Sequence, residues 1–192
     1  MAQVLNDGLR RLEDLEQLTH HAARLEQSNS QLENEIEVRR HLEGVQHGRM
    51  RVLELMARGA GLEQTLSALV EAAELANPNI LASVLLLDEE GKRLYTGAAA
   101  RLPDFYNEAI NGMTIGPGQG SCGTSAHSGS RVVVEDIASH PYWANFREVA
   151  GRAGLAACWS EPIVAAAGNI MGTFALYSRQ PYIPSEEDLG FS

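Results

Sequence analysis

Residues 116–163 read GPGQGSCGTSAHSGSRVVVEDIASHPYWANFREVAGRAGLAACWSEPI, and the rest of the chain is interpreted around them. A glycine-rich turn leads into small residues around Cys122, and an apolar segment with an acidic end follows. A Pro-Tyr-Trp segment then crosses to a second apolar segment that carries Cys158 and Trp159. Both cysteines and both tryptophans of the chain lie here. Such side chains gathered in one irregular region predict a pocket and the segment that covers it.

The size and composition set limits on the function. The 192 residues allow one ordinary domain with an appendage, and 44% hydrophobic residues suffice for a core. The net charge of -10 and the lack of a basic stripe argue against nucleic-acid binding. Two cysteines without CxxC spacing are typical of a reducing cytoplasm and favour neither a zinc site nor a disulfide framework. No apolar run approaches ~18 residues, so no membrane segment is expected.

A long helix without proline is predicted over residues 3–58. Heptad a positions fall on Leu15, Ala22, Asn29 and Ile36, and d positions on Leu18, Leu25 and Leu32. Apolar residues run at three-residue steps upstream, and downstream the pattern resumes out of phase through Leu42, Val45, Val52 and Met56. Because one such helix cannot bury its own stripe, we expect a homodimer. Asn29 at an a position favours a parallel coiled coil, and the alternative is a solitary charged helix.

The remainder predicts an α+β fold. A helix is expected over 62–76, a hairpin over 80–100, a short helix over 103–110 and a helix with irregular entry over 141–152. Further strands are expected over 132–134, 155–160, 163–167 and 170–177. These elements predict an antiparallel sheet of about six strands, with helices on one face and crossover segments closing the other. A last helix beginning at 185–187 is cut off at Ser192. The predicted domains are a coiled-coil helix over 1–58 and a globular domain over 59–192.

Several segments resemble the GAF domain. They are LEQTL at 62–66, ASVLLLD at 82–88, GQGSCGT at 118–124, VEDI at 134–137, GLAACWSEPI at 154–163 and GTFA at 172–175. More narrowly, they resemble the GAF subfamily found between PAS modules and GGDEF/EAL or histidine-kinase outputs in bacterial signalling proteins. The resemblance covers about residues 50–192, and the helix in front resembles a signalling helix. Gly61 stands where this subfamily often has proline, and the C-terminal helix towards an output domain is missing.

The resemblance implies a cytoplasmic, non-enzymatic sensory module. It would bind a small ligand or relay a signal through the dimeric coiled coil to an output domain outside this chain, for cyclic di-GMP turnover or a kinase. One alternative is a thiol-based redox enzyme resembling free methionine-R-sulfoxide reductase, through Cys122 and Cys158. Another is a structural dimerisation module without ligand. The sequence identifies no cofactor.

The candidate pocket residues are Cys122, Asp136, Tyr142, Trp143, Arg147, Cys158, Trp159 and Phe174. Cys122, near a helix start, is a candidate for a lowered pKa. A salt bridge between Asp136 and Arg147 that fixes the covering segment is favoured over ligand contact, while the aromatic residues equally fit a core. His127 and His140 are the histidines outside the long helix, and in some GAF domains such a residue binds haem or iron. A lone histidine is more often a loop residue, so no metal ligand and no catalytic residue are predicted.

Overall fold

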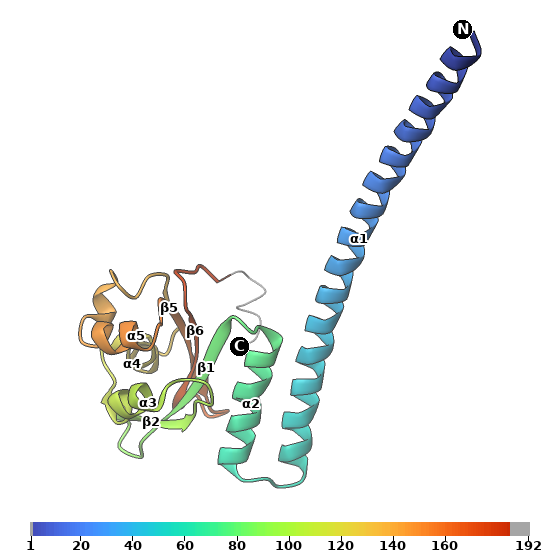
Figure 1. Cartoon of the computed structure of the whole chain (residues 1–192). Helices are drawn as coiled ribbons and strands as arrows, with labels where there is room; N and C mark the ends of the chain where they lie inside the picture. The colour runs from blue at the N-terminus through green and yellow to red at the C-terminus, as the bar shows by residue number, and fades with distance from the viewer. Residues whose placement is uncertain (1, 185–192) are drawn as a thin grey trace. The chain divides into compact units, whose positions relative to one another are not determined.

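The computed structural model describes residues 2–184, and within its first helix it omits the side chains of residues 2–19, 22, 23, 37 and 41. The chain divides into two compact units, residues 1–43 and 44–192. The first unit holds most of helix α1 (Ala2–Ala57), drawn in blue in Figure 1. No helix in the described part is long and apolar enough to span a membrane. The helix expected from 185 lies outside the described residues.

The predicted coiled-coil positions lie on α1. Leu15, Leu18 and Ala22 are among the residues whose side chains are not described. The side chains of Leu25, Asn29, Leu32 and Ile36 are exposed on the helix surface. A pairing of two such helices therefore stays a prediction.

The second unit is built on a six-stranded antiparallel sheet in the order β3-β2-β1-β6-β5-β4. The strands are β1 (Ile80–Leu87), β2 (Arg93–Ala98), β3 (Met113–Thr114), β4 (Val132–Val134), β5 (Ala157–Val164) and β6 (Ile170–Ser178). The central pair, β1 and β6, comes very close at Gly172, where a Cβ would lie 2.1 Å from the Leu85 carbonyl oxygen. The α+β fold with about six antiparallel strands is confirmed.

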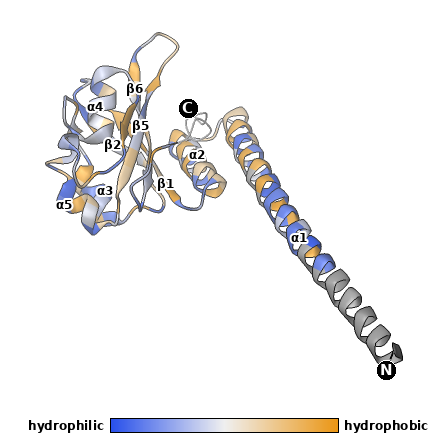
Figure 2. Ribbon diagram, turned by 90° about the horizontal axis from the view of Figure 1, so that it is seen from above, coloured by the Kyte–Doolittle hydropathy of each residue, from blue (hydrophilic) through white to orange (hydrophobic). Residues whose placement is uncertain are grey.

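Helices cover both faces of this sheet (Figure 1). Helix α2 (Leu62–Ala76) packs on β1 and β2 at one face. The other face carries α3 (Asp104–Ile110), α4 (Gly120–Ser128), the short 3-10 helix η1 (Pro141–Trp143) and α5 (Arg147–Arg152). The expectation of helices on one face alone was therefore too simple, because the crossover segments contain helices of their own. Figure 2 shows the apolar colouring of the strands and of α2 that these layers bury.

Strand β5 is longer than expected. The sequence predicted one strand ending at Ser160 and another beginning at Ile163, with Pro162 between them. In the structure β5 runs unbroken through Pro162 and forms the final hairpin with β6. The neighbouring strand β4 pairs only as far as Ser160. Beyond that point β5 is an edge on one side, where proline is tolerated.

The last part of α1 belongs to the same compact unit as the sheet and packs on α2. Gly48 is buried, and a Cβ at this position would lie 2.4 Å from the Cβ of Ala72. Arg51 forms a 3.6 Å ion pair with Glu71 of α2. Val45 and Val52 share the helix face of Gly48 and are half-buried. These two residues were expected to continue the coiled-coil stripe, and here they instead lie on the face towards α2.

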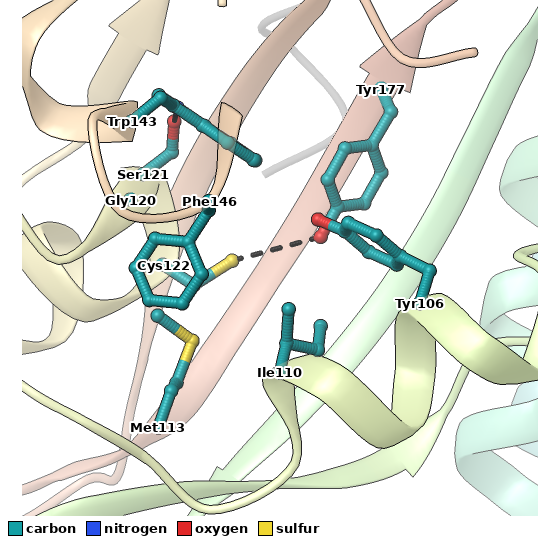
Figure 3. Close-up of a pocket in the computed structure, with 9 residues that line it drawn as sticks. All are labelled: Tyr106, Ile110, Met113, Gly120, Ser121, Cys122, Trp143, Phe146 and Tyr177. Atoms are coloured by element: carbon teal, nitrogen blue, oxygen red, sulfur yellow. Dashed lines mark hydrogen bonds between the residues drawn. The ribbon is translucent and has the colours of Figure 1, made fainter. Parts of the chain in front are cut away.

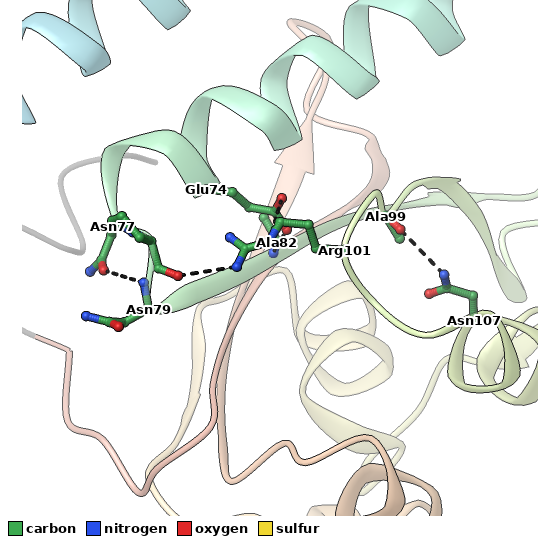
Figure 4. Close-up of polar contacts among 8 residues, drawn as sticks. Glu74, Asn77, Asn79, Ala82, Ala99, Arg101 and Asn107 are labelled. Atoms are coloured by element: carbon green, nitrogen blue, oxygen red, sulfur yellow. Dashed lines mark hydrogen bonds and ion pairs between the residues drawn. The ribbon is translucent and has the colours of Figure 1, made fainter.

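A buried carboxylate joins α2 to the sheet (Figure 4). The Ala82 amide donates a 3.0 Å hydrogen bond to Glu74 Oε1, and Arg101 Nε lies 3.9 Å from Glu74 Oε2. Strand β2 pairs with β1 only from Val84 onward, so the outer edge of β1 is open at Ala82. Glu74 therefore accepts the hydrogen bond of the Ala82 amide, which no neighbouring strand pairs on that edge.

Candidate functional site

A small cavity lies between strand β6 and the segments that cover it (Figure 3). Its volume is about 10 Å³, close to the space that one water molecule needs. Its lining consists of Tyr106, Ile110, Met113, Gly120, Ser121, Cys122, Trp143, Phe146 and Tyr177. These described residues include no Asp, Glu, Lys, Arg or His. The cavity therefore suits a small uncharged molecule better than a carboxylate or a phosphate.

Glycines fix the position of helix α4, which supplies three of the lining residues. Gly120 begins the helix with a φ of 61°, in the left-handed region that favours glycine. At Gly123 a Cβ would lie 2.7 Å from the Gln119 Cβ and 3.0 Å from the Thr114 carbonyl oxygen. The backbone of α4 therefore lies directly against the loop before it. This close approach lets Cys122 reach the interior above the sheet.

Cys122 lies among polar groups of the sheet. Its Sγ is 3.9 Å from the hydroxyl oxygen of Tyr177, and that oxygen is 3.2 Å from Ser83 Oγ. The ring of Tyr106 meets the ring of Tyr177 edge-on, with centroids 6.0 Å apart. All four side chains are buried. The sulfur of Cys122 thus lies at the end of a chain of buried hydroxyls.

The environment of Cys122 favours its ionised form. The neighbouring Cys158 thiol is the largest influence, and the hydroxyls of Ser160, Thr173 and Tyr177 add to it. Against the opposing effect of burial, these groups lower the pKa of Cys122 to about 7. A thiolate is the nucleophilic form of cysteine, so a pKa near neutrality makes Cys122 a reactive side chain.

Cys158 has the opposite character. It is fully buried on β5, in register with Tyr177 of β6. Burial, together with the adjacent Cys122, raises the pKa of Cys158 well above its usual range. The two thiols are therefore unequal, and the pair favours a thiolate on Cys122 over one on Cys158. Both cysteines are free in this structure.

Two hydroxyls near these sulfurs have no hydrogen-bond partner in the described structure other than the Cys122 sulfur that they face. They are the Oγ of Ser160 and the Oγ1 of Thr173, and both side chains are fully buried. A buried hydroxyl without a partner costs about 1–3 kcal/mol. The same two groups favour the thiolate of Cys122. This interior is thus better suited to a negative charge on Cys122 than to a neutral thiol.

The crossover segment between β4 and β5 closes the cavity through Trp143 and Phe146, whose rings meet edge-on with centroids 6.5 Å apart. Trp143 Nε1 donates a 3.1 Å hydrogen bond to Ser121 Oγ. Ser121 Oγ lies 3.4 Å from the Cys158 carbonyl oxygen, to which it donates in turn. The covering segment, α4 and β5 are therefore connected through one hydroxyl. We call residues 136–153 the lid.

Of the predicted pocket residues, Cys122 and Trp143 line the cavity and Cys158 lies beside it. Tyr142 is half-buried and packs against His140 at 4.7 Å between ring centroids. Asp136 and Arg147 make no ion pair with each other among the described contacts. Asp136 instead accepts hydrogen bonds from Ala138 N and Ser139 Oγ in its own turn. Arg147 donates to the His140 carbonyl oxygen at 3.4 Å, so both residues fix the shape of the lid.

Trp159 and Phe174 do not line this cavity. They belong to the core on the α2 face of the sheet, where the ring of Trp159 stacks at a tilt on Tyr182, 5.6 Å away. Successive residues of a strand point to opposite faces, so Cys158 and Trp159 cannot both face the cavity. Their grouping in the sequence as one pocket was wrong for this reason.

Sequence reasoning missed several lining residues: Tyr106, Ile110, Met113, Gly120, Ser121, Phe146 and Tyr177. Only Tyr177 could have been inferred from the sequence, because residues 173, 175 and 177 alternate along a predicted strand and so lie on one face of the sheet. Its pairing with Cys158 requires the β5–β6 register, which the sequence leaves open.

The two histidines outside α1 lie away from the cavity lining. His127 is exposed in the last turn of α4. His140 Nδ1 accepts a 3.2 Å hydrogen bond from the Tyr142 amide. Among the described residues, no three His, Cys, Asp or Glu side chains are grouped closely enough to hold a metal ion.

Known proteins similar to this chain include sensors and enzymes. A methyl sulfide methyltransferase-associated sensor from Methanosarcina acetivorans is 44% identical over 141 residues, which cover 73% of this chain. The chain spans 14% of that relative's length. Two solved structures show a similar fold. The GAF domain of a phosphoenolpyruvate-protein phosphotransferase from Coxiella burnetii has a TM-score of 0.62 and 18% identity, covering 79% of this chain and 85% of its own.

The second solved structure is free methionine-R-sulfoxide reductase from Neisseria meningitidis in complex with its substrate. Its TM-score is 0.59 with 17% identity, over 79% of this chain and 80% of its own. At these identities the two structures show the fold alone. A family model described as the GAF domain matches residues 59–191. The six-stranded sheet, the buried cavity under a lid and this match agree: the chain belongs to the GAF domain family.

Proposed function

We propose that this chain is a regulatory sensory module of a signalling protein, in which a small uncharged molecule acts on the cavity beside Cys122. The observation that carries the proposal is the hydrogen bond from Trp143 to Ser121. It connects the lid of a cavity without charged lining to the helix that holds Cys122. Occupation of the cavity would change this contact and move the lid relative to the sheet.

The signal would leave through a parallel homodimer. Leu25 and Leu32, two d positions of the heptads, are 65% and 52% exposed in the single chain. Asn29 lies between them at an a position, where its amide would be satisfied by the same residue of a second copy. A change of packing or register along α1 would then reach an output domain beyond this chain. In this proposal that domain is cytoplasmic and turns over cyclic di-GMP or acts as a kinase.

Native mass spectrometry of the purified chain tests both parts. The expected result is a dimer, which carries extra mass if a ligand is retained during purification. Small uncharged candidates that fit the cavity should raise the melting temperature, and the rise should increase with the logarithm of their concentration above Kd. A monomer at micromolar concentration would rule out the dimer. Unchanged melting with every small neutral candidate would favour the alternative of a structural module without ligand.

A matched pair of variants locates the dimer contact. Leu25→Glu with Leu32→Glu places charges in the proposed seam and should give a monomer in analytical ultracentrifugation. Val38→Glu is the control, because Val38 is 60% exposed but lies outside the a and d positions. It should remain a dimer. If the two variants had the same oligomeric state, a coiled coil in this register would be contradicted.

A thiol-based redox enzyme is the second candidate, because the pKa of Cys122 is lowered to about 7 beside a second thiol. Catalysis would require repeated turnover of a sulfoxide substrate with an added reductant. Reduction of free methionine-R-sulfoxide by the wild-type chain, lost in Cys122→Ser, would establish this activity. If no turnover occurs, the enzymatic function is excluded and the sensory module stands.

A further inference from the structure

We infer that Cys122 and Cys158 form a peroxide-responsive pair, in which a hydroperoxide oxidises Cys122 and Cys158 then closes a disulfide. This inference rests on the proposed sensory function and names the chemical class of its input. It makes the cavity a reaction chamber for one small oxidant rather than a reversible binding site.

The placement of the two sulfurs carries the inference. Cys122 lines the cavity from α4, while Cys158 lies on β5 behind it and is fully buried. Ser121 bonds to the carbonyl oxygen of Cys158, which holds α4 against β5 at this point. The Tyr177 hydroxyl lies 3.9 Å from the Cys122 sulfur, and Tyr177 is paired in the sheet with Cys158. One thiol is therefore reachable from the cavity, and the other is reachable only from the first.

The cavity selects the class of oxidant. At about 10 Å³ it has space for a molecule of about the size of water. Its described lining carries no Asp, Glu, Lys, Arg or His that would attract or pair with an ion. Hydrogen peroxide is uncharged, small and able to hydrogen-bond to hydroxyls such as those of Ser121 and Tyr177. Glutathione disulfide is charged and bulky, so it does not fit this entrance.

The hydroxyls around Cys122 prepare the first step. Ser160 and Thr173 have no hydrogen-bond partner in the described structure other than the Cys122 sulfur, so their hydroxyls can donate to its negatively charged form. They come from β5 and β6, which form the floor beneath α4. A thiolate attacks a peroxide, whereas a neutral thiol does so poorly. These hydroxyls therefore favour the reactive form of Cys122.

The chemistry balances in two steps. The Cys122 thiolate attacks one peroxide oxygen, the O–O bond breaks, and the departing hydroxide takes a proton to become water. Cys122 is now a sulfenic acid. The Cys158 sulfur then attacks the Cys122 sulfur, the S–O bond breaks, and the leaving hydroxide takes the Cys158 proton. In total, two thiols and one hydrogen peroxide give one disulfide and two waters, a two-electron oxidation of the protein.

The disulfide would act on the lid. Joining the two sulfurs draws α4 onto β5 at Ser121, the residue that accepts the Trp143 hydrogen bond. Ser121, which contacts the lid, and Cys122, which would form the disulfide, are thus adjacent residues of α4. Oxidation would in this way convert a chemical event in the cavity into a movement of residues 136–153.

The test is peroxide titration of the reduced chain, followed by intact-mass measurement and peptide mapping. One equivalent of hydrogen peroxide should remove the mass of two hydrogen atoms and link the peptides of Cys122 and Cys158. Cys158→Ser should stop at the sulfenic acid, with the added mass of one oxygen atom, and dimedone should trap this form once the chain is unfolded after the reaction. Cys122→Ser should keep Cys158 reduced. Oxidation of Cys158 at the wild-type rate in Cys122→Ser would overturn the inference.

A conservative substitution gives a readout that does not depend on losing a cysteine. Thr173→Val keeps the shape but removes a hydroxyl that stabilises the thiolate. Oxidation should become roughly three- to tenfold slower near pH 7 and approach the wild-type rate near pH 9, where the thiol ionises without help. Thr96→Val makes the same change on exposed β2 and should leave the rate unchanged. Equal rates for Thr173→Val and wild type at all pH values would contradict the role of the hydroxyls.

Failure of this inference and failure of the sensory function are distinguishable. If both thiols survive peroxide while a neutral ligand shifts the melting temperature, the inference is wrong and the sensory module stands. If the disulfide forms but the dimer, the melting temperature and lid protection in hydrogen exchange do not change, the thiol chemistry is right. The sensory function would then be wrong.

Discussion

Trp143 and Ser121 are joined by a 3.1 Å hydrogen bond between buried side chains, from the indole Nε1 to the hydroxyl Oγ. Ser121 in turn donates to the carbonyl oxygen of Cys158 at 3.4 Å. Three elements that are separate in the sequence therefore meet at one hydroxyl. The cavity lies directly beside this junction.

Replacing Ser121 by alanine should destabilise the domain. The variant leaves the Trp143 indole N–H buried without its acceptor, which costs about 1–3 kcal/mol in the free energy of unfolding. Trp143→Phe together with Ser121→Ala should cost less than the two single changes added, by about 0.5–3 kcal/mol. Urea unfolding measures all three variants. Ser130→Ala, at an exposed position in the loop after α4, serves as the control, and strict additivity would contradict the coupling.

Alanine at Gly48 should destabilise the packing of α1 on α2. Its Cβ would lie 2.4 Å from the Cβ of Ala72, so the helices must separate. Gly44→Ala is the control on the same helix, because a Cβ added there would have no atom within 4 Å. There, alanine should stabilise by up to about 1 kcal/mol through helix propensity alone. Thermal unfolding should thus move in opposite directions for the two glycines, and an equal gain would disprove the close contact.

Proline at Gly61 should stabilise the start of α2. Gly61 is the N-cap of this helix with a φ of -61°, close to the value that the proline ring imposes. No atom lies within 4 Å of an added Cβ, and no described backbone hydrogen bond uses the Gly61 amide. Gly61→Pro should raise the free energy of unfolding by about 0.4–1 kcal/mol, because it restricts the unfolded chain. Gly61→Ala should give a smaller gain, and a loss with proline would show strain at Ala60.

Glu74 should make stability depend on pH. Burial is the main cause that raises the pKa of this carboxyl, against the Ala82 amide and Arg101, which lower it. The folded state therefore binds the proton more tightly than the unfolded state. The resulting stabilisation is fully present below the unfolded pKa and is lost as the pH rises through the folded pKa.

Glu74→Gln tests this assignment, because the amide stays neutral and its oxygen can still accept from Ala82. Urea midpoints from about pH 4 to pH 8 should fall less for this variant than for wild type. Glu74→Leu removes the acceptor and should lose about 1–3 kcal/mol at every pH. Glu63→Gln, on the exposed start of α2, is the control. Parallel pH profiles for Glu74→Gln and wild type would refute the raised pKa.

Much of the fold was predictable because its signals are local. Alternating and continuous apolar runs identified the strands, and glycine and proline marked the turns. The break expected between Ser160 and Ile163 was wrong, because β5 continues through Pro162 where the neighbouring strand β4 does not pair with it. The apolar stripe through Val45 and Val52 correctly indicated an apolar face of α1 from local evidence. The sequence does not say which helix covers that face.

The candidate site was predictable in its chemistry but only partly in its membership. The sequence by itself determined that a glycine-rich turn, two cysteines and a Trp-containing crossover belong to one region of a GAF domain. Only the tertiary structure decided that Cys122, Cys158 and Tyr177 share one side of the sheet while Trp159 and Phe174 face the other. The physical reason is that successive side chains of a strand point to opposite faces of the sheet. The register between β5 and β6, set by contacts distant in the sequence, then chooses which of them meet.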